Sequence, residues 1–149
     1  MKILLRVLGT AASAALLSCA STDVTLPSGP INLTGTYFGT QDGIDAGIAF
    51  QEDIIQMAII QEGDSLSGQW EALFGGIGTL SAEIIPSDSI LEFNFELLQA
   101  DPCEGLYAGV AEARVGVRGT GETTVGISGS YTGSDCDGAV EADFIIVRN

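Results

Sequence analysis

Three cysteines are the residues of this 149-residue chain whose chemistry follows most directly from their positions. Cys103 and Cys136 are each followed by an acidic residue and a glycine. If Cys19 serves another purpose they form an even pair, and such pairs become disulfides in oxidising compartments. The chain has no histidine, and its only lysine is Lys2, so it offers neither thiol an activating base. We therefore predict one intramolecular disulfide between Cys103 and Cys136.

Carboxylates are the other abundant reactive groups, with 20 Asp and Glu against 5 Lys and Arg. Asp42, Asp45, Glu52 and Asp53 can supply oxygen ligands to calcium, but their spacing matches no EF-hand loop. Solvated acids are the better interpretation, so we predict no metal site. The absence of histidine removes the commonest general base, and neither G-x-S-x-G nor a P-loop is present. We expect a protein that is not an enzyme and needs no cofactor.

The N-terminal segment is typical of an export signal. Lys2 and Arg6 precede a short apolar stretch over 7–17, which is too short to span a bilayer. The segment ends in Leu16-Leu17-Ser18-Cys19, which resembles a bacterial lipobox. The resemblance implies that residues 1–18 are a signal peptide and that Cys19 carries palmitate-type acyl chains. Ala20, rather than Asp, implies the outer membrane. The alternative is an ordinary secretory signal with an incidental cysteine.

Removal of residues 1–18 would leave a strongly acidic protein. Three arginines would face 20 acids, a net charge of −17. Such a surface repels phosphate backbones, so we expect no nucleic-acid partner. We expect contact with the membrane through the N-terminal lipid anchor. A solvated acidic surface is the simpler interpretation, and low-affinity cation binding is the alternative. Residues 19–30, with two prolines, form the predicted lipidated tether, and 31–149 form one domain, expected to be a monomer.

Alternation of apolar and polar residues predicts strands throughout the domain. A unit of the form apolar–Ser/Thr–Gly–x–aromatic occurs three times, ending at Tyr37, Trp70 and Tyr131. The expected strands are Asn32–Thr40, Ile54–Gln61, Ser65–Leu73, Ile77–Ile85, Ile90–Gln99, Gly105–Val117, Thr123–Gly133 and Ala139–Arg148. Gln41 to Asp53 shows no clean alternation, so we expect a long connection there, with one helical turn. In the second strand Ile55, Met57 and Ile59 are expected to share the inner face.

Eight antiparallel strands, each with one apolar face, favour an all-β up-and-down barrel, because closure removes exposed edges. A two-sheet β-sandwich is the alternative. In the meander, the turns that carry Cys103 and Cys136 fall at the same end of adjacent hairpins. The topology is therefore consistent with the predicted disulfide.

The first and last strands carry a family resemblance. Gly35-Thr36-Tyr37 opens the first strand and Arg148 closes the last, which resembles the calycin pattern of lipocalins and avidins. The resemblance implies that Tyr37 plugs the closed end of the barrel and that Arg148 lies across its ring. The chain as a whole looks like small bacterial lipoproteins with lipocalin-like barrels.

Barrels of eight strands lie at the boundary between a filled interior and room for one small ligand. Two functions therefore remain open: a lipid-anchored carrier of a small apolar molecule, and a structural or interaction module of the envelope with a filled barrel. For the carrier, the mouth lies at the end of the first hairpin, with Phe50 and Phe74 beside it. The expected cavity residues are Met57, Trp70, Phe93, Phe95, Tyr107, Tyr131 and Phe144.

Overall fold

The structure, a computed structural model, describes residues 31–74, 76–85, 91–117 and 122–149. This part of the chain is all-β and contains no helix. The proposed signal peptide, Cys19 and the tether lie outside the described residues. Residues 75, 86–90 and 118–121 also lie outside the described residues.

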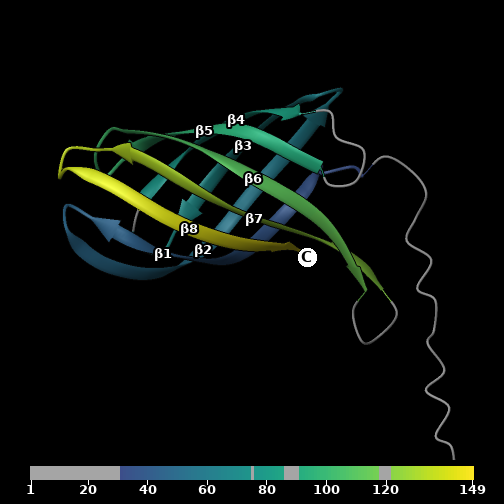
Figure 1. Ribbon diagram of the computed structural model, residues 1–149, viewed down its shortest axis with the longest axis horizontal. Helices are drawn as coiled ribbons and strands as arrows, with labels where there is room; N and C mark the ends of the chain where they lie inside the picture. The colour runs from purple at the N-terminus through teal and green to yellow at the C-terminus, as the bar shows by residue number, and fades with distance from the viewer. Residues whose placement is uncertain (1–30, 75, 86–90, 118–121) are drawn as a thin grey trace, which may run out of the picture.

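Eight strands close into a barrel in which each strand pairs antiparallel with its neighbours along the chain (Figure 1). The last strand pairs with the first from Tyr37–Arg148 to Asp45–Val140, which closes the sheet. The predicted up-and-down barrel is thus confirmed, and the sandwich alternative is excluded. The strands are β1 Gly35–Asp45, β2 Ile48–Glu62, β3 Ser65–Ala72, β4 Gly76–Ile85, β5 Leu91–Asp101, β6 Gly105–Val117, β7 Thr123–Ser134 and β8 Ala139–Arg148.

The interior follows from strict alternation along most strands. In β5, Phe93, Phe95 and Leu97 are buried while the residues between them are exposed. In β8 the same pattern runs from Val140 to Ile146. Because successive side chains of a strand point to opposite faces, every second residue enters one continuous core. 

The buried residues of all eight strands form a single hydrophobic cluster.

The connection between the first two strands differs from the sequence prediction. Gln41 to Asp53 is not a long loop with a helical turn, since β1 and β2 continue through it and meet at the two-residue turn Ala46-Gly47. Both turn residues have positive φ, 47° and 85°, as a tight hairpin turn of the primed type requires. Glycine takes this conformation readily, whereas Ala46 gave no such signal in the sequence.

A β-bulge explains why the alternation was misleading here. Ile54 pairs with Ala72 and Gln56 with Glu71, so β2 carries one extra residue relative to β3. Ile55 therefore lies on the outer wall, 38% exposed, and its predicted inward position was wrong. Met57 and Ile59 face inward as predicted. Because a bulge reverses the phase of a strand, Glu52 also becomes an inward residue.

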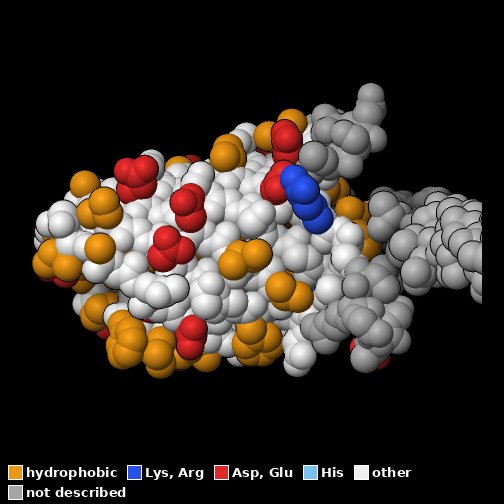
Figure 2. Space-filling model, turned by 60° about the horizontal axis from the view of Figure 1, so that its bottom comes forward, with side chains coloured by type: hydrophobic (Ala, Val, Ile, Leu, Met, Phe, Trp, Pro, Cys, Tyr) orange, Lys and Arg blue, Asp and Glu red, His pale blue; other side chains and the backbone are white. Residues whose placement is uncertain are grey.

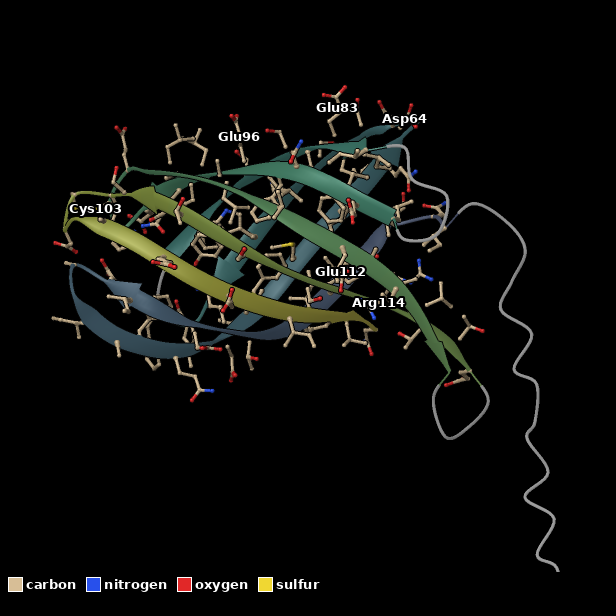
Figure 3. All side chains as sticks on the ribbon, viewed as in Figure 1. Asp64, Glu83, Glu96, Cys103, Glu112 and Arg114 are labelled. Carbon is tan, nitrogen blue, oxygen red and sulfur yellow. A yellow bond between two sulfur atoms is a disulfide. The ribbon has the colours of Figure 1, made fainter. Side chains whose placement is uncertain are left out.

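The two ends of the barrel differ in character. The five most deeply buried large side chains all lie toward the end where β1 begins and β8 ends: Leu33, Tyr37, Leu66, Ile127 and Ile146. We call this the closed end. The opposite end, which we call the mouth, carries the β1–β2, β3–β4, β5–β6 and β7–β8 turns. Figure 3 shows Cys103 at the mouth and Asp64 and Glu83 toward the closed end.

The outer wall carries separate acidic groups and scattered apolar side chains. On the face shown in Figure 2, acidic side chains are spread over the wall, some of them beside the basic side chain, and apolar side chains gather toward the mouth. Ile48 and Phe74 are the most exposed large apolar residues in the described part of the chain, at 72% and 79%. Arg114 forms a surface ion pair with Glu112, at 2.8 Å.

Small inward residues let the sheet bend tightly. Two glycines of β7, Gly129 and Gly126, provide a test of this interpretation. A Cβ on Gly129 would lie 2.5 Å from the Val110 carbonyl oxygen, whereas one on Gly126 would meet nothing nearer than 3.8 Å. We predict that Gly129→Ala destabilises the barrel by about 1–3 kcal/mol, because backbone must move. Gly126→Ala is the matched control and should be neutral, or stabilising by up to about 1 kcal/mol. Chemical denaturation measures both, and equal effects would contradict this account of the bend.

Candidate functional site

A cavity of about 200 Å³ lies at the mouth, and we call it the mouth chamber. It is surrounded by residues from the mouth halves of seven strands and from two hairpin turns. Its aromatic wall is made of Phe50, Trp70, Phe74, Tyr107 and Tyr131. Its polar wall is made of Gln41, Asp45, Gln51, Glu52, Gln99 and Asp135. Leu97 and Val140 complete the lining.

A buried carboxylate anchors the polar wall. Glu52 is only 9% exposed, and its Oε1 accepts a hydrogen bond from Gln41 Nε2 at 2.7 Å. Its Oε2 accepts from the backbone N–H of Phe74, also at 2.7 Å. Tyr131 in turn donates its hydroxyl hydrogen to Gln41 Oε1 at 3.0 Å. The network joins β7, β1, β2 and the β3–β4 turn, so it fixes the shape of the chamber as well as its polarity.

A second network lines the chamber through β5, β6 and the β7–β8 turn. The Tyr107 hydroxyl is 3.2 Å from Gln99 Oε1 and 3.1 Å from Asp135 Oδ2, and its single hydrogen is shared between these two acceptors. Gln99 Nε2 donates to the carbonyl oxygen of Cys103 at 3.0 Å. Asp135 Oδ1 accepts from the backbone N–H groups of Asp137 and Gly138. These bonds hold the β5–β6 and β7–β8 turns against β6.

The disulfide predicted from the sequence joins these same two turns. Cys103 and Cys136 are bonded, with their Cα atoms 5.9 Å apart. Because Asp135 directly precedes Cys136, the bond also fixes the backbone that carries this carboxylate. The pairing between adjacent hairpins at one end confirms the inference drawn from the meander topology.

The electrostatics of the chamber follow from burial and from its acids. Burial raises the pKa of the Tyr131 hydroxyl, and the nearby carboxylates of Glu52 and Asp45 raise it further. Burial also raises the pKa of Tyr107, and Asp135 adds to the shift. For Asp45, burial raises the carboxyl pKa, with repulsion from Asp135 and Asp137 as the further causes. The two tyrosines are therefore hydrogen-bond donors at neutral pH rather than bases.

Two polar atoms near the chamber have no hydrogen-bond partner among the described residues. They are Asp45 Oδ1 and Trp70 Nε1, and both are buried. Trp70 is 7% exposed, and a Cβ on Gly78 would lie 2.8 Å from its Nε1, so the edge of the indole lies against β4. Buried polar groups are usually paired, so these two mark the chamber as incomplete in hydrogen bonding.

Below the chamber the barrel is almost filled. The gap that remains there is only about 20 Å³, roughly the space of one water molecule. Of the sequence-predicted cavity residues, Met57, Phe93, Phe95 and Phe144 line this gap. Phe95 and Phe144 pack edge to face, with ring centroids 5.6 Å apart. The deep interior is thus a packed aromatic core.

The remaining predicted cavity residues lie nearer the mouth of the barrel. Trp70 and Tyr131 line both spaces, whereas Tyr107 lines the chamber and not the gap below. The rings of Tyr107 and Tyr131 are 5.5 Å apart. The expected mouth residues, Phe50 and Phe74, both line the chamber.

At the closed end the structure brings Tyr37 and Arg148 together as directly paired residues of β1 and β8. Tyr37 has no exposed surface, and its hydroxyl donates to the Leu33 carbonyl oxygen at 2.8 Å. Arg148 Nη1 donates to the carbonyl oxygen of Asn32 at 2.8 Å. The arginine therefore ties the segment before β1 to the end of β8.

Sequence reasoning missed the polar wall. Gln41 and Glu52 lie in the stretch that was interpreted as a loop, and the bulge after Ile54 hid the phase of β2. Gln99 had a usable signal, because it continues the inward alternation of Phe93, Phe95 and Leu97 by one more step. A polar residue at the end of an apolar alternation is the pattern that predicts a polar mouth.

The acids considered for calcium do not converge. Asp45 and Glu52 face the chamber, whereas Asp42 and Asp53 are exposed on the outer wall. Within the described ranges, one group of thiols and acids has metal-like spacing, and it consists of Cys103, Cys136 and Asp137. Its two sulfur atoms are bonded to each other, so they are not available as thiolate ligands.

Comparisons with protein-family models, with curated proteins and with solved structures find no match to this chain. In the part of the chain that the structure describes, no helix has the length and apolar character needed to cross a membrane. The closed antiparallel barrel is consistent with a calycin-like fold.

The three tyrosines of the chain, two in the chamber and Tyr37 at the closed end, provide a pH test of the buried hydroxyls. Burial raises the pKa of Tyr37, Tyr107 and Tyr131 above the ordinary value of 10.0. The folded state therefore holds protons that the unfolded state releases, so stability should be intact below pH 10 and fall as the pH rises beyond it. We predict that tyrosinate absorbance appears in one step, together with loss of the β-sheet circular dichroism signal. A gradual titration centred near pH 10 in folded protein would contradict the buried hydroxyls.

Proposed function

We propose that this protein is a lipid-anchored lipoprotein of the bacterial outer membrane whose barrel binds a small molecule without catalysing its reaction. The observation that carries the proposal is the mouth chamber, which combines about 200 Å³ of space with a polar wall and an aromatic wall. Such a combination of apolar surface and a few fixed polar groups is typical of small-molecule sites. The packed interior beneath it provides a rigid floor.

The size of the chamber limits the ligand. Pockets for drug-sized ligands usually measure about 300–1,000 Å³, so a chamber of about 200 Å³ suits a smaller molecule. The gap of about 20 Å³ below it leaves no channel for a long acyl chain. The apolar carrier expected from the sequence is therefore narrowed to a binder of small, partly polar molecules.

A binding role without catalysis is supported by the character of the polar groups. The chain has no histidine, and the chamber hydroxyls of Tyr107 and Tyr131 are held protonated. Both oxygens of Glu52 already accept a hydrogen bond from the protein. The polar groups are thus arranged as fixed hydrogen-bonding partners, and none forms a pair of nucleophile and base.

A second candidate function, an interaction module of the envelope, is favoured by one feature of the outer wall. Phe38 on β1 pairs with Val147 on β8, and Ile145 lies two residues further along the same face. These three side chains are 38–56% exposed and form an apolar strip across the closing strands. Retention of a partner protein that is lost in Phe38→Ser but not in chamber variants would favour this second function.

The chamber and the outer wall each offer a phenylalanine, which gives a matched test of binding. Native mass spectrometry of the processed protein released from membranes should show a bound small molecule. We predict that Phe74→Ala, which opens the chamber wall, lowers its occupancy at least several-fold. Phe74 is 79% exposed, so the change should leave stability almost intact. Phe38→Ala is the control and should retain the ligand; a purely apo mass for the unaltered protein would contradict the proposal.

The anchor has a separate test. We predict that metabolic labelling with a palmitate analogue marks the unaltered protein and that Cys19→Ser abolishes both the label and the membrane association. Cys19 is the only cysteine outside the disulfide, so the variant leaves the barrel unchanged. Membrane association that survives in Cys19→Ser would contradict lipid anchoring.

A further inference from the structure

We propose that the ligand of the mouth chamber is a small organic cation, namely a protonated amine carried on a short or monocyclic apolar group. This inference rests on the binding function proposed above and names the chemical class of its ligand. Three properties of the chamber support it independently: its charge, its hydrogen-bonding balance and its aromatic wall.

The charged groups that line the chamber are all acidic. Asp45, Glu52 and Asp135 line it, and its described lining contains no arginine or lysine. The two described arginines make their contacts elsewhere, Arg114 with Glu112 on the outer wall and Arg148 at the closed end. After Lys2 the chain contains no lysine, so residues 31–149 have no lysine ammonium group to place in the chamber. Glu52 is nine-tenths buried, and its two hydrogen-bond partners are neutral amide groups, so a bound cation would give it a charged partner.

The hydrogen-bonding balance also favours a donor-rich ligand. The hydroxyl hydrogens of Tyr107 and Tyr131 are used within the protein, and the amides of Gln41 and Gln99 each donate to another group. A carboxylate can accept about four hydrogen bonds, whereas Glu52 receives two. Asp45 Oδ1 is buried and receives none from the described residues. The carboxylates of Glu52 and Asp45 therefore keep unused acceptor sites, which an ammonium group with three N–H donors can fill.

The aromatic wall supplies the third argument, and Trp70 is its central member. A buried tryptophan retained for its hydrogen bond would have an acceptor for Nε1, yet here Nε1 has none among the described residues. What Trp70 contributes to the chamber is the surface of its ring. Together with Phe50, Phe74, Tyr107 and Tyr131 it forms an aromatic wall beside three carboxylates. Aromatic faces attract ammonium groups electrostatically, through the negative potential above the ring.

The pKa of Asp45 is consistent with this class of ligand. Burial raises it, and repulsion from Asp135 and Asp137 raises it further. A cation placed among these groups would relieve the repulsion.

Three probes of nearly equal size separate the ligand class from binding as such. Benzylammonium, benzyl alcohol and benzoate share one ring and differ in charge. Trp70 is the only tryptophan of the chain, so its fluorescence reports binding in the chamber of the processed full-length protein in non-ionic detergent. We expect benzylammonium to bind at least about tenfold more tightly than benzyl alcohol, which corresponds to about 1.4 kcal/mol. Benzoate should bind more weakly than either.

Two variants and a control locate the effect. Glu52→Gln and Asp45→Asn should each weaken benzylammonium binding by about fivefold or more and leave benzyl alcohol binding within about twofold. Asp45→Asn removes no hydrogen bond at Oδ1, so it keeps the test valid if Glu52→Gln does not fold. Glu96→Gln removes the same charge from the outer wall, where Figure 3 places Glu96, and should change neither affinity.

The outcomes separate the two proposals. If benzyl alcohol or benzoate binds as tightly as benzylammonium, the cation inference is overturned while small-molecule binding stands. If none of the three probes alters Trp70 fluorescence and the membrane-derived protein also carries no ligand, both proposals fail. If Glu96→Gln weakens benzylammonium binding as much as Glu52→Gln does, the attraction is general surface charge, and the chamber assignment is overturned.

Discussion

The pairing of β1 with β8 is the constraint on which the rest of the structure depends. It runs without interruption from Tyr37–Arg148 to Asp45–Val140, so neither strand has an unpaired edge. Once the ring is closed, the interior has a fixed circumference, and every inward residue must fit within it. Inward glycines such as Gly39 and Gly129, where an added Cβ would collide with backbone of a neighbouring strand, are a consequence of this tight closure.

Most of the fold could be predicted because its signals are local. In β5 and β8 the alternation of side chains is unbroken, so period two identified both the strands and their inner faces. The disulfide was predicted from the even pair of cysteines and agreed with the topology, since a meander places the β5–β6 and β7–β8 turns at one end. The prediction for the β1–β2 hairpin was wrong for a physical reason. The bulge at Ile55 reverses the phase within one strand, and Ala46 occupies a turn position that usually signals itself with glycine or asparagine.

The site was harder to predict than the fold because it depends on polar residues that occupy inner positions. Gln41, Glu52 and Gln99 each continue the inward face of a strand beyond its apolar part. A single sequence gives no warning that a glutamate faces inward unless the phase of its strand is known. The aromatic residues were easier to identify, yet alternation alone did not separate those that fill the core from those that border the chamber. Whether an aromatic residue fills the core or borders the chamber depends on its position along the barrel axis. Only the register of the strands determines that position.

The position at which the chain enters the barrel has a consequence for how the protein would meet its surroundings. Leu33 packs beside Tyr37 at the closed end, so the described part of the chain begins at the pole opposite the chamber. Under the proposed anchoring at Cys19, the lipid would be joined to the sealed pole and not to the pole that opens into the chamber. A solute would then enter the barrel at the end that carries no anchor.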